Sequence, residues 1–138
     1  MSTQAQNKAV VQQFVHALGR GDVETLKTVM ATDIQAVATG TSVFSTTRGY
    51  DDIVGAAGML GLFTQNGIEM KIVSMTAEED RVSCEVEGYS TLKNDAPYNN
   101  QYHFLFTLRD SKIVGLREYM CTKLVDSVLV PVVMGSAA

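Results

Sequence analysis

Metal-binding and disulfide-forming residues are scarce in this sequence. Its 138 residues include two cysteines, two histidines and no tryptophan. Cys84 and Cys121 lack metal-ligand spacing and lie in strand-like runs, which predicts buried, reduced thiols. His16 and His103 have no partner for a nucleophilic triad or a metal site, and no glycine-rich phosphate loop is present. The sequence therefore predicts no bound metal and no cofactor.

Long hydrophobic runs and clusters of basic residues are also missing. The longest apolar stretch near the C-terminus, residues 127–135, is far too short to span a bilayer. The polar N-terminus does not resemble a secretory leader. The net charge is −4 and the basic residues are scattered, so no electrostatic footprint for nucleic acid or an anionic membrane is visible. These absences predict a cytoplasmic protein with no nucleic-acid or membrane partner.

The residues that are present have the composition of an ordinary globular domain. Hydrophobic residues make up 46% of the chain and charged residues 19%. The length is typical of one domain, and no repeat, linker or low-complexity tract divides it. We expect a single domain over residues 1–138.

Two helices are expected within the first thirty residues. Apolar residues recur at helical spacing over residues 3–18, and Gly19 and Gly21 end this segment. Asp22 is a natural N-cap for a second helix that runs through Met30.

The rest of the chain predicts one more helix and a sheet. A short bent strand or hairpin is expected over residues 34–44 and a third helix over residues 48–64. Four strand-like runs follow, over residues 68–75, 81–92, 98–108 and 112–123. Helices gathered on one face of an antiparallel sheet make an α+β domain.

Three segments resemble the SnoaL-like proteins. They are residues 10–34, the run RGYDDI at 48–53, and FTLRDSKIVGLREYMCTKLVD at 106–126. SnoaL-like proteins are a branch of the nuclear-transport-factor-2-like superfamily, alongside ketosteroid isomerases and limonene-epoxide hydrolases. The resemblance implies a curved antiparallel sheet with three helices on its concave face, forming a cone-shaped pocket. It does not imply one function, because this fold hosts isomerases, cyclases, hydrolases and non-catalytic binders.

The resemblance also implies that two known catalytic sets are not retained. The tyrosine, carboxylate base and protonated aspartic acid of ketosteroid isomerases correspond here to Phe14, Ala38 and Phe104. These side chains can neither move a proton nor donate to an oxyanion. The arginine and two aspartates of the epoxide hydrolases correspond to Glu85, Glu87 and Glu118, and their water-holding pair corresponds to Ala36 and Ala38.

Glu118 is the strongest candidate for a catalytic residue. Strand alternation places it on one face with Val114, Leu116 and Met120. Desolvation there would raise its pKa and make it a usable general acid or base. The alternative is that Glu118 pairs with an arginine or caps hydrogen bonds at the pocket rim.

The orientation of Glu85 and Glu87 has two interpretations. Alternation alone puts both glutamates and Tyr89 toward water, with the core on the opposite face. The resemblance implies the reverse, with Glu87 as a second catalytic residue and Glu85 and Tyr89 as substrate-binding residues. It then makes the other face an apolar homodimer contact, formed by Val82, Cys84 and Val86. Convergence of Glu85, Glu87 and Glu118 would be the one remaining route to a metal site.

A cavity is expected between the first and third helices and the concave face of the sheet. Asn100 and Tyr102 lie on the aromatic face of their strand and suit the polar group of a ligand, although such an aromatic stripe is more often core. The expected apolar lining is Phe14, Met59, Leu60, Phe63, Tyr102, Phe104 and Met120.

Three functions fit this pocket. The first is a cofactor-free cyclase, isomerase or hydratase that moves a proton on a small hydrophobic carbonyl or polyketide-like compound. The second is a non-catalytic module that binds a hydrophobic molecule, and the third is a structural homodimer with a vestigial cavity. The protonation state of Glu118 discriminates between the first two.

Overall fold

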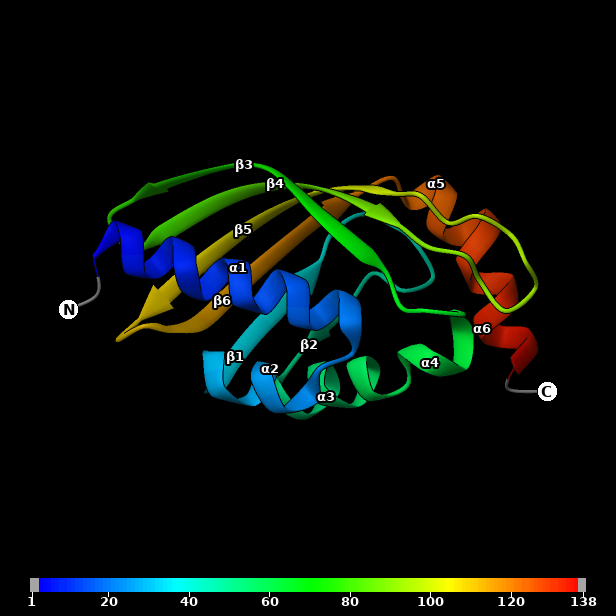
Figure 1. The fold of residues 1–138 in the computed structure, drawn as a ribbon, viewed down its shortest axis with the longest axis horizontal. Coiled ribbons are helices and arrows are strands. Elements are labelled where there is room, and N and C mark those ends of the chain that lie inside the picture. The colour runs from blue at the N-terminus through cyan, green and yellow to red at the C-terminus, as the bar shows by residue number, and fades with distance from the viewer. Residues whose placement is uncertain (1–2, 137–138) are drawn as a thin grey trace.

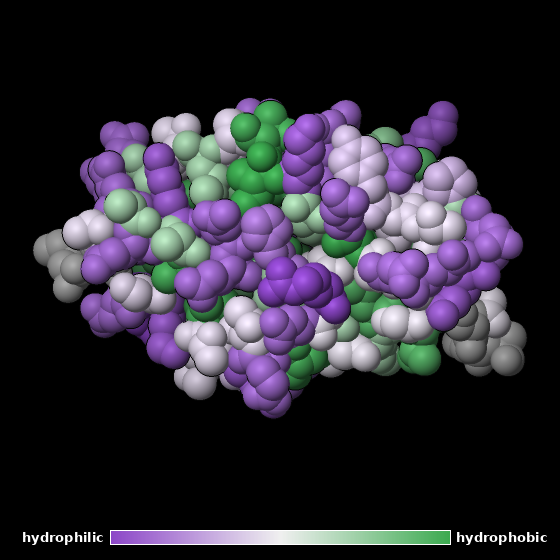
Figure 2. All heavy atoms as spheres, viewed as in Figure 1, coloured by the Kyte–Doolittle hydropathy of each residue, from purple (hydrophilic) through white to green (hydrophobic). Residues whose placement is uncertain are grey.

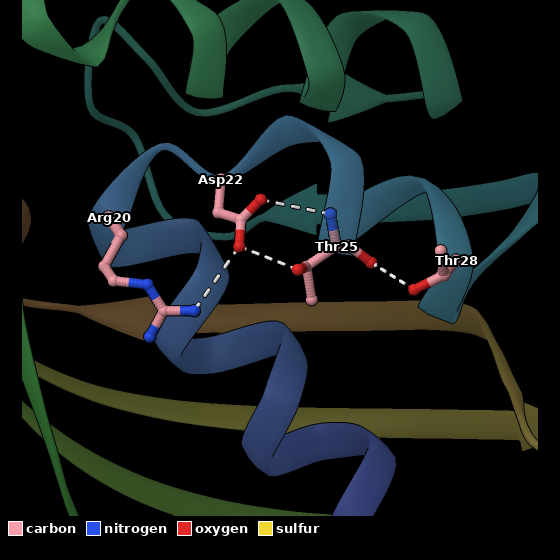
Figure 3. A network of polar contacts seen from close by, with 4 residues as sticks. All are labelled: Arg20, Asp22, Thr25 and Thr28. Carbon is pink, nitrogen blue, oxygen red and sulfur yellow. Dashed lines mark hydrogen bonds and ion pairs between the residues drawn. The ribbon is translucent and has the colours of Figure 1, made fainter.

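Two helices open the chain, as the capping residues predict. The computed structural model describes residues 3–136. Helix α1 (Gln4–Arg20) ends at Gly21, whose φ of +69° suits glycine. Helix α2 (Val23–Val29) begins at Asp22, whose carboxylate accepts hydrogen bonds from the Thr25 backbone N–H at 3.2 Å and hydroxyl at 2.7 Å. Figure 3 shows this cap, with Arg20 on the other side of the same carboxylate.

The strands form one curved, six-stranded sheet (Figure 1). The strand order is β2-β1-β6-β5-β4-β3, and β1 runs parallel to β6 while the other neighbours are antiparallel. The α+β class is therefore confirmed, in a mixed sheet with one parallel pair. The strands are β1 (Met30–Ala38), β2 (Thr47–Arg48), β3 (Glu69–Glu78), β4 (Arg81–Tyr89), β5 (Gln101–Arg109) and β6 (Lys112–Met120).

The third expected helix is divided in two. Helix α3 covers Tyr50–Gly58, and a single turn, α4, covers Leu60–Phe63. The break falls at Met59, next to Gly58, in a segment whose glycines weaken helix propensity. The expected start of this helix near Gly49 is confirmed, since Gly49 is the N-cap of α3.

The C-terminal segment is helical, which the sequence did not predict. It comprises α5 (Thr122–Leu124), a π-helical turn η1 (Val125–Leu129) and α6 (Val130–Ser136). Strand β6 therefore ends before Cys121, and the prediction that this thiol is buried is wrong. No helix within residues 3–136 has the length and apolarity that a bilayer crossing requires.

The concave side of the sheet is covered by α1 (Figure 1). Val82, Cys84 and Val86 of β4 lie beneath it and are 0–2% exposed. Burial raises the pKa of the Cys84 thiol to about 11, with a smaller contribution from Glu85. Seen from the side of α1, the outer surface is mostly hydrophilic, with hydrophobic residues visible between polar ones (Figure 2).

The burial of this β4 face decides between the two interpretations of the strand. Alternation was correct, and the reversed orientation implied by the resemblance is wrong, because α1 already fills the space over the valines. Val82, Cys84 and Val86 cannot form a dimer contact while they are buried within one chain. Homodimerisation itself stays a prediction, and it would have to use another surface.

Candidate functional site

A cavity of about 260 Å³ lies between the C-terminal end of α1, the loop after β1, α3, the sheet and the C-terminal helices. Its floor is the sheet, through Tyr102, Phe104, Glu118 and Met120. The remaining lining residues are Leu18, Ala38, Thr39, Ser42, Phe44, Ser45, Arg48, Ala56, Ala57, Leu60, Ile68, Met70, Tyr98, Thr122, Val125 and Leu129.

The size of the cavity limits what it can hold. An apolar cavity of about 150 Å³ is known to accommodate benzene, so 260 Å³ suits a body of about ten non-hydrogen atoms. Most of the lining is apolar, as expected of small-molecule sites. The cavity therefore fits a compact, largely hydrophobic molecule of one or two rings.

Glu118 lies in the floor of this cavity. It occurs on β6, opposite Phe104 of β5 and Ala38 of β1. Desolvation raises its pKa to about 7, and the nearby charge of Arg48 opposes that rise. Within residues 3–136 its carboxyl group has no hydrogen bond or ion pair with another side chain. The group is therefore free to exchange a proton with a ligand near neutral pH.

The strand alternation around Glu118 was predicted with one error. Leu116 and Met120 do share its side of the sheet, because they pair with Phe106 and Tyr102 while Glu118 pairs with Phe104 between them. Val114 does not, because the β5–β6 pairing shifts between Thr107 and Leu108 and turns Val114 toward the outer face.

Two tyrosines lie beside Glu118 and interact with each other. Burial raises the pKa of the Tyr98 and Tyr102 hydroxyls, and interaction between the two hydroxyls adds to the rise for Tyr102 and opposes it for Tyr98. The Asn100 Nδ2 donates to the Tyr98 oxygen at 3.0 Å. A hydroxyl oxygen has two lone pairs and one hydrogen. Because Asn100 occupies one lone pair, the Tyr98 hydroxyl keeps its hydrogen and its second lone pair for Tyr102 or for a ligand in the cavity.

Asn100 holds this arrangement and does not line the cavity. Its side chain is buried, and its amide also donates to the Cys121 carbonyl at 3.2 Å. Its Oδ1 accepts from the backbone N–H groups of Gln101 at 2.8 Å and Cys121 at 3.3 Å. Asn100 was predicted to bind substrate, and the structure instead shows it positioning Tyr98 and the start of the C-terminal helices.

Arg48 is a cavity residue that the sequence did not single out. It ends β2 and lines the cavity, where its Nη2 donates to the Phe44 carbonyl at 3.0 Å. The pattern around it signalled only the start of a helix. What brings it to the cavity is the pairing of β2 with β1, which local sequence does not specify.

The predicted apolar lining is partly present. Tyr102, Phe104, Met120 and Leu60 line the cavity. Phe14 is instead packed in the core against Phe106, with ring centroids 5.5 Å apart. Phe63 packs against a second cluster around Leu92, and Met59 is 49% exposed. The break between α3 and α4 is what turns Met59 outward.

The three candidates on β4 lie on the other side of the sheet. Glu85 accepts a hydrogen bond from the Ser74 hydroxyl at 3.1 Å, and Glu87 accepts one from the Tyr89 hydroxyl at 3.2 Å. Their strand positions alternate with the buried valines of β4, so Glu85, Glu87 and Tyr89 face away from Glu118. Glu87 therefore cannot act with Glu118, and Glu85 and Tyr89 cannot contact a ligand in the cavity. Among residues 3–136 no three acidic, histidine or cysteine side chains are grouped to hold a metal ion.

Comparison with known proteins gives a consistent family and fold. A SnoaL-like domain model matches residues 11–116. An NTF2-like protein of Burkholderia xenovorans LB400 is 24% identical, with a TM-score of 0.71 over 89% of this chain and 95% of the other. Bal32a, from a soil-derived mobile gene cassette, is 17% identical, with a TM-score of 0.78 over 89% and 95%.

A third solved structure is described as a proposed polyketide cyclase. It is IdmH of Streptomyces antibioticus, which is 17% identical, with a TM-score of 0.72 over 86% of this chain and 94% of the other. At these identities the structural likenesses establish the fold alone. No curated protein sequence matches this chain.

Proposed function

The chain belongs to the SnoaL-like domain family, and from this premise we propose that it catalyses proton transfer on a small hydrophobic carbonyl compound. The observation that supports this most is Glu118, a carboxyl group in an apolar cavity whose pKa is raised to about 7. A general acid or base works best when its pKa lies near the operating pH. The polyketide cyclase description of one structural relative is in keeping with this chemistry.

The proposed reaction needs no cofactor. The ionised Glu118 carboxylate removes a proton from the carbon next to the substrate carbonyl, and the electron pair moves onto the carbonyl oxygen. The Tyr98 hydroxyl donates to that oxygen, and Tyr102 and Asn100 hold Tyr98 in place. Return of the proton to another carbon completes an isomerisation. Attack of the enolate carbon on a second carbonyl of the same molecule, followed by protonation from Glu118, completes a cyclisation.

Proton exchange provides a direct test. The ketone 2-tetralone has eleven non-hydrogen atoms and acidic hydrogens next to its carbonyl, which suits the cavity. In D₂O near pH 7 the wild type should accelerate loss of these hydrogens in the NMR spectrum. Glu118→Gln should reduce the acceleration by a factor of about 10² to 10⁴. Tyr98→Phe should reduce it by a factor of about 10² to 10³.

Glu87→Gln is the matched control, because it makes the same chemical change on the opposite face of the sheet. It should leave the exchange rate unchanged. Binding of 2-tetralone without accelerated exchange would contradict catalysis and favour a ligand-binding module. That second function is supported by Phe14, Ala38 and Phe104, the apolar residues that the resemblance aligns with the base and the two oxyanion donors of ketosteroid isomerases. Cytoplasmic location and homodimeric assembly stay predictions.

A further inference from the structure

Arg48 is a cation without an acidic partner in a mostly apolar cavity. The ion pairs of residues 3–136 are Arg20–Asp22, Lys27–Glu24 and Arg109–Asp33, and none includes Arg48. Its guanidinium group carries five N–H donors. One of the N–H groups of Nη2 donates to the Phe44 carbonyl. A partly desolvated cation with unused donors favours an anionic ligand.

Glu118 does not neutralise this charge within the free protein. Arg48 is near enough to oppose the rise in the Glu118 pKa, but no ion pair joins the two side chains. Both residues line the same cavity. Desolvation also leaves a substantial part of Glu118 protonated near neutrality, so its repulsion of a second carboxylate is reduced.

The other polar groups near Arg48 already have partners. The Ser42 hydroxyl donates to the Asp126 carboxylate at 2.6 Å, and the Ser45 hydroxyl donates to the Thr39 carbonyl at 2.9 Å. The Thr39 hydroxyl donates to the Glu118 carbonyl at 2.7 Å. These three hydroxyls are therefore engaged within the protein, and Arg48 is the cation that this side of the cavity offers to a ligand.

We propose that the ligand of this pocket is a small carboxylic acid, whose carboxylate pairs with Arg48 while its apolar body fills the cavity. Guanidinium and carboxylate match as a two-bond pair, and the volume of about 260 Å³ leaves room for about ten non-hydrogen atoms. The inference rests on the proposed function, since it names the substrate class of the same pocket. Combined with proton transfer at Glu118, it specifies a small oxo acid with an apolar chain or ring.

An acid and its amide test the role of charge. We would measure the affinities of 3-phenylpropanoate and 3-phenylpropanamide at pH 7 by calorimetry, because both have eleven non-hydrogen atoms and differ in charge. The acid should bind the wild type at least tenfold more tightly. Arg48→Gln should weaken acid binding about ten- to a hundredfold and change amide binding by less than about twofold. Arg48→Lys should fall between, because lysine keeps the charge without the planar donor pair.

Arg20→Gln is the control, because it removes an equal charge from an exposed arginine outside the cavity lining. It should leave both affinities unchanged. Equal binding of acid and amide to the wild type would overturn the inference and leave the proposed pocket function intact. An equal loss of both affinities in Arg48→Gln would also overturn it. That result would mean that Arg48 acts by holding the Phe44 carbonyl and not by pairing with the carboxylate of the ligand. If neither compound binds the wild type, this inference fails, and the exchange experiment with 2-tetralone decides the proposed function separately. The wild-type ratio of affinities decides the matter even if Arg48→Gln does not fold.

Discussion

The concave side of the sheet is solid at one end and hollow at the other. At the solid end Phe14 of α1 packs edge-on against Phe106, next to Val82 and Cys84, and all four side chains are 0–1% exposed. At the hollow end Glu118, Tyr98 and Tyr102 are among the residues that line a cavity. The same strands, β5 and β6, serve both ends.

Side-chain size accounts for the difference. Large residues on α1 reach the sheet at the solid end, whereas Ala38, Ala56 and Ala57 line the hollow end and fill little space. Glu118 lies at the hollow end, where a ligand can replace the hydration that its carboxyl group loses on burial. One face of the sheet therefore forms a packed core where large side chains meet it and a cavity where the facing residues are alanines.

Removing a ring from the solid end should have the largest effect on stability. Phe106→Ala leaves a void among fully buried neighbours and should lower the free energy of unfolding by about 3–5 kcal/mol. Met120→Ala at the hollow end only enlarges an existing cavity and should lose less than half as much. Urea unfolding of both variants measures the contrast. Similar losses for the two would mean that the hollow end is packed as tightly as the solid end.

Replacing Glu118 should make the hollow end more stable at high pH. The folded pKa of about 7 lies above the unfolded value of about 4.5, so the wild type loses stability as pH rises between these two values. Glu118→Gln removes that loss, which is roughly 3 kcal/mol once Glu118 is ionised. Its stability relative to the wild type should therefore rise from pH 4.5 to pH 8 in urea unfolding. A variant less stable than the wild type at pH 8 would instead show that Glu118 anchors a buried ion pair.

Filling the hollow end should remove binding with little change in stability. Ala38 lies beside Glu118 and lines the cavity, so Ala38→Leu places three more carbons in the ligand space. Affinity for the 3-phenylpropanoate probe should fall at least about tenfold, with a stability change within about 1 kcal/mol. Val37→Leu adds volume on the opposite face and should leave affinity unchanged. Retained affinity in Ala38→Leu would place the ligand elsewhere.

Glu87→Gln should have the smallest effect on stability. It shows whether the effect of Glu118→Gln is specific to the cavity side of the sheet. The Glu87 side chain lies on the outer face, where its carboxylate accepts a hydrogen bond from the Tyr89 hydroxyl. We expect a stability change below about 0.5 kcal/mol and a pH profile like that of the wild type. A pH-dependent stabilisation like that of Glu118→Gln would show that the two glutamates share one environment.

The local sequence predicted most helix and strand boundaries correctly, but it did not predict which strands pair over long sequence separations. The Asp22 cap and Gly21 set the boundary between α1 and α2, and alternation set the faces of β4. The parallel pairing of β1 with β6 joins residues about eighty positions apart, and neither strand carries a local sign of its partner. That pairing brings Ala38 beside Glu118, so part of the site could not be read from either segment alone.

The C-terminal helices show a second limit. Residues 125–133 are rich in valine and contain Pro131, a composition with weak helix propensity. Tertiary packing overrides it, because Val125 and Val132 are buried against Leu92 and Tyr98. The exposure of Cys121 was predicted wrongly and the position of Arg48 in the cavity was not predicted, for a related reason. Both properties depend on how distant segments pack against each other.

The parallel β1–β6 pair has a consequence for synthesis of the chain. Ribosomes add about 5–20 residues per second, so β1 emerges several seconds before β6 begins at Lys112. Throughout that interval β1 has an open edge that can pair with the wrong strand. Contacts of such high sequence separation also slow folding. Strand β6 joins β1 to β5 and also carries Glu118, so the nascent chain completes its six-stranded sheet and places Glu118 beside the cavity in the same step.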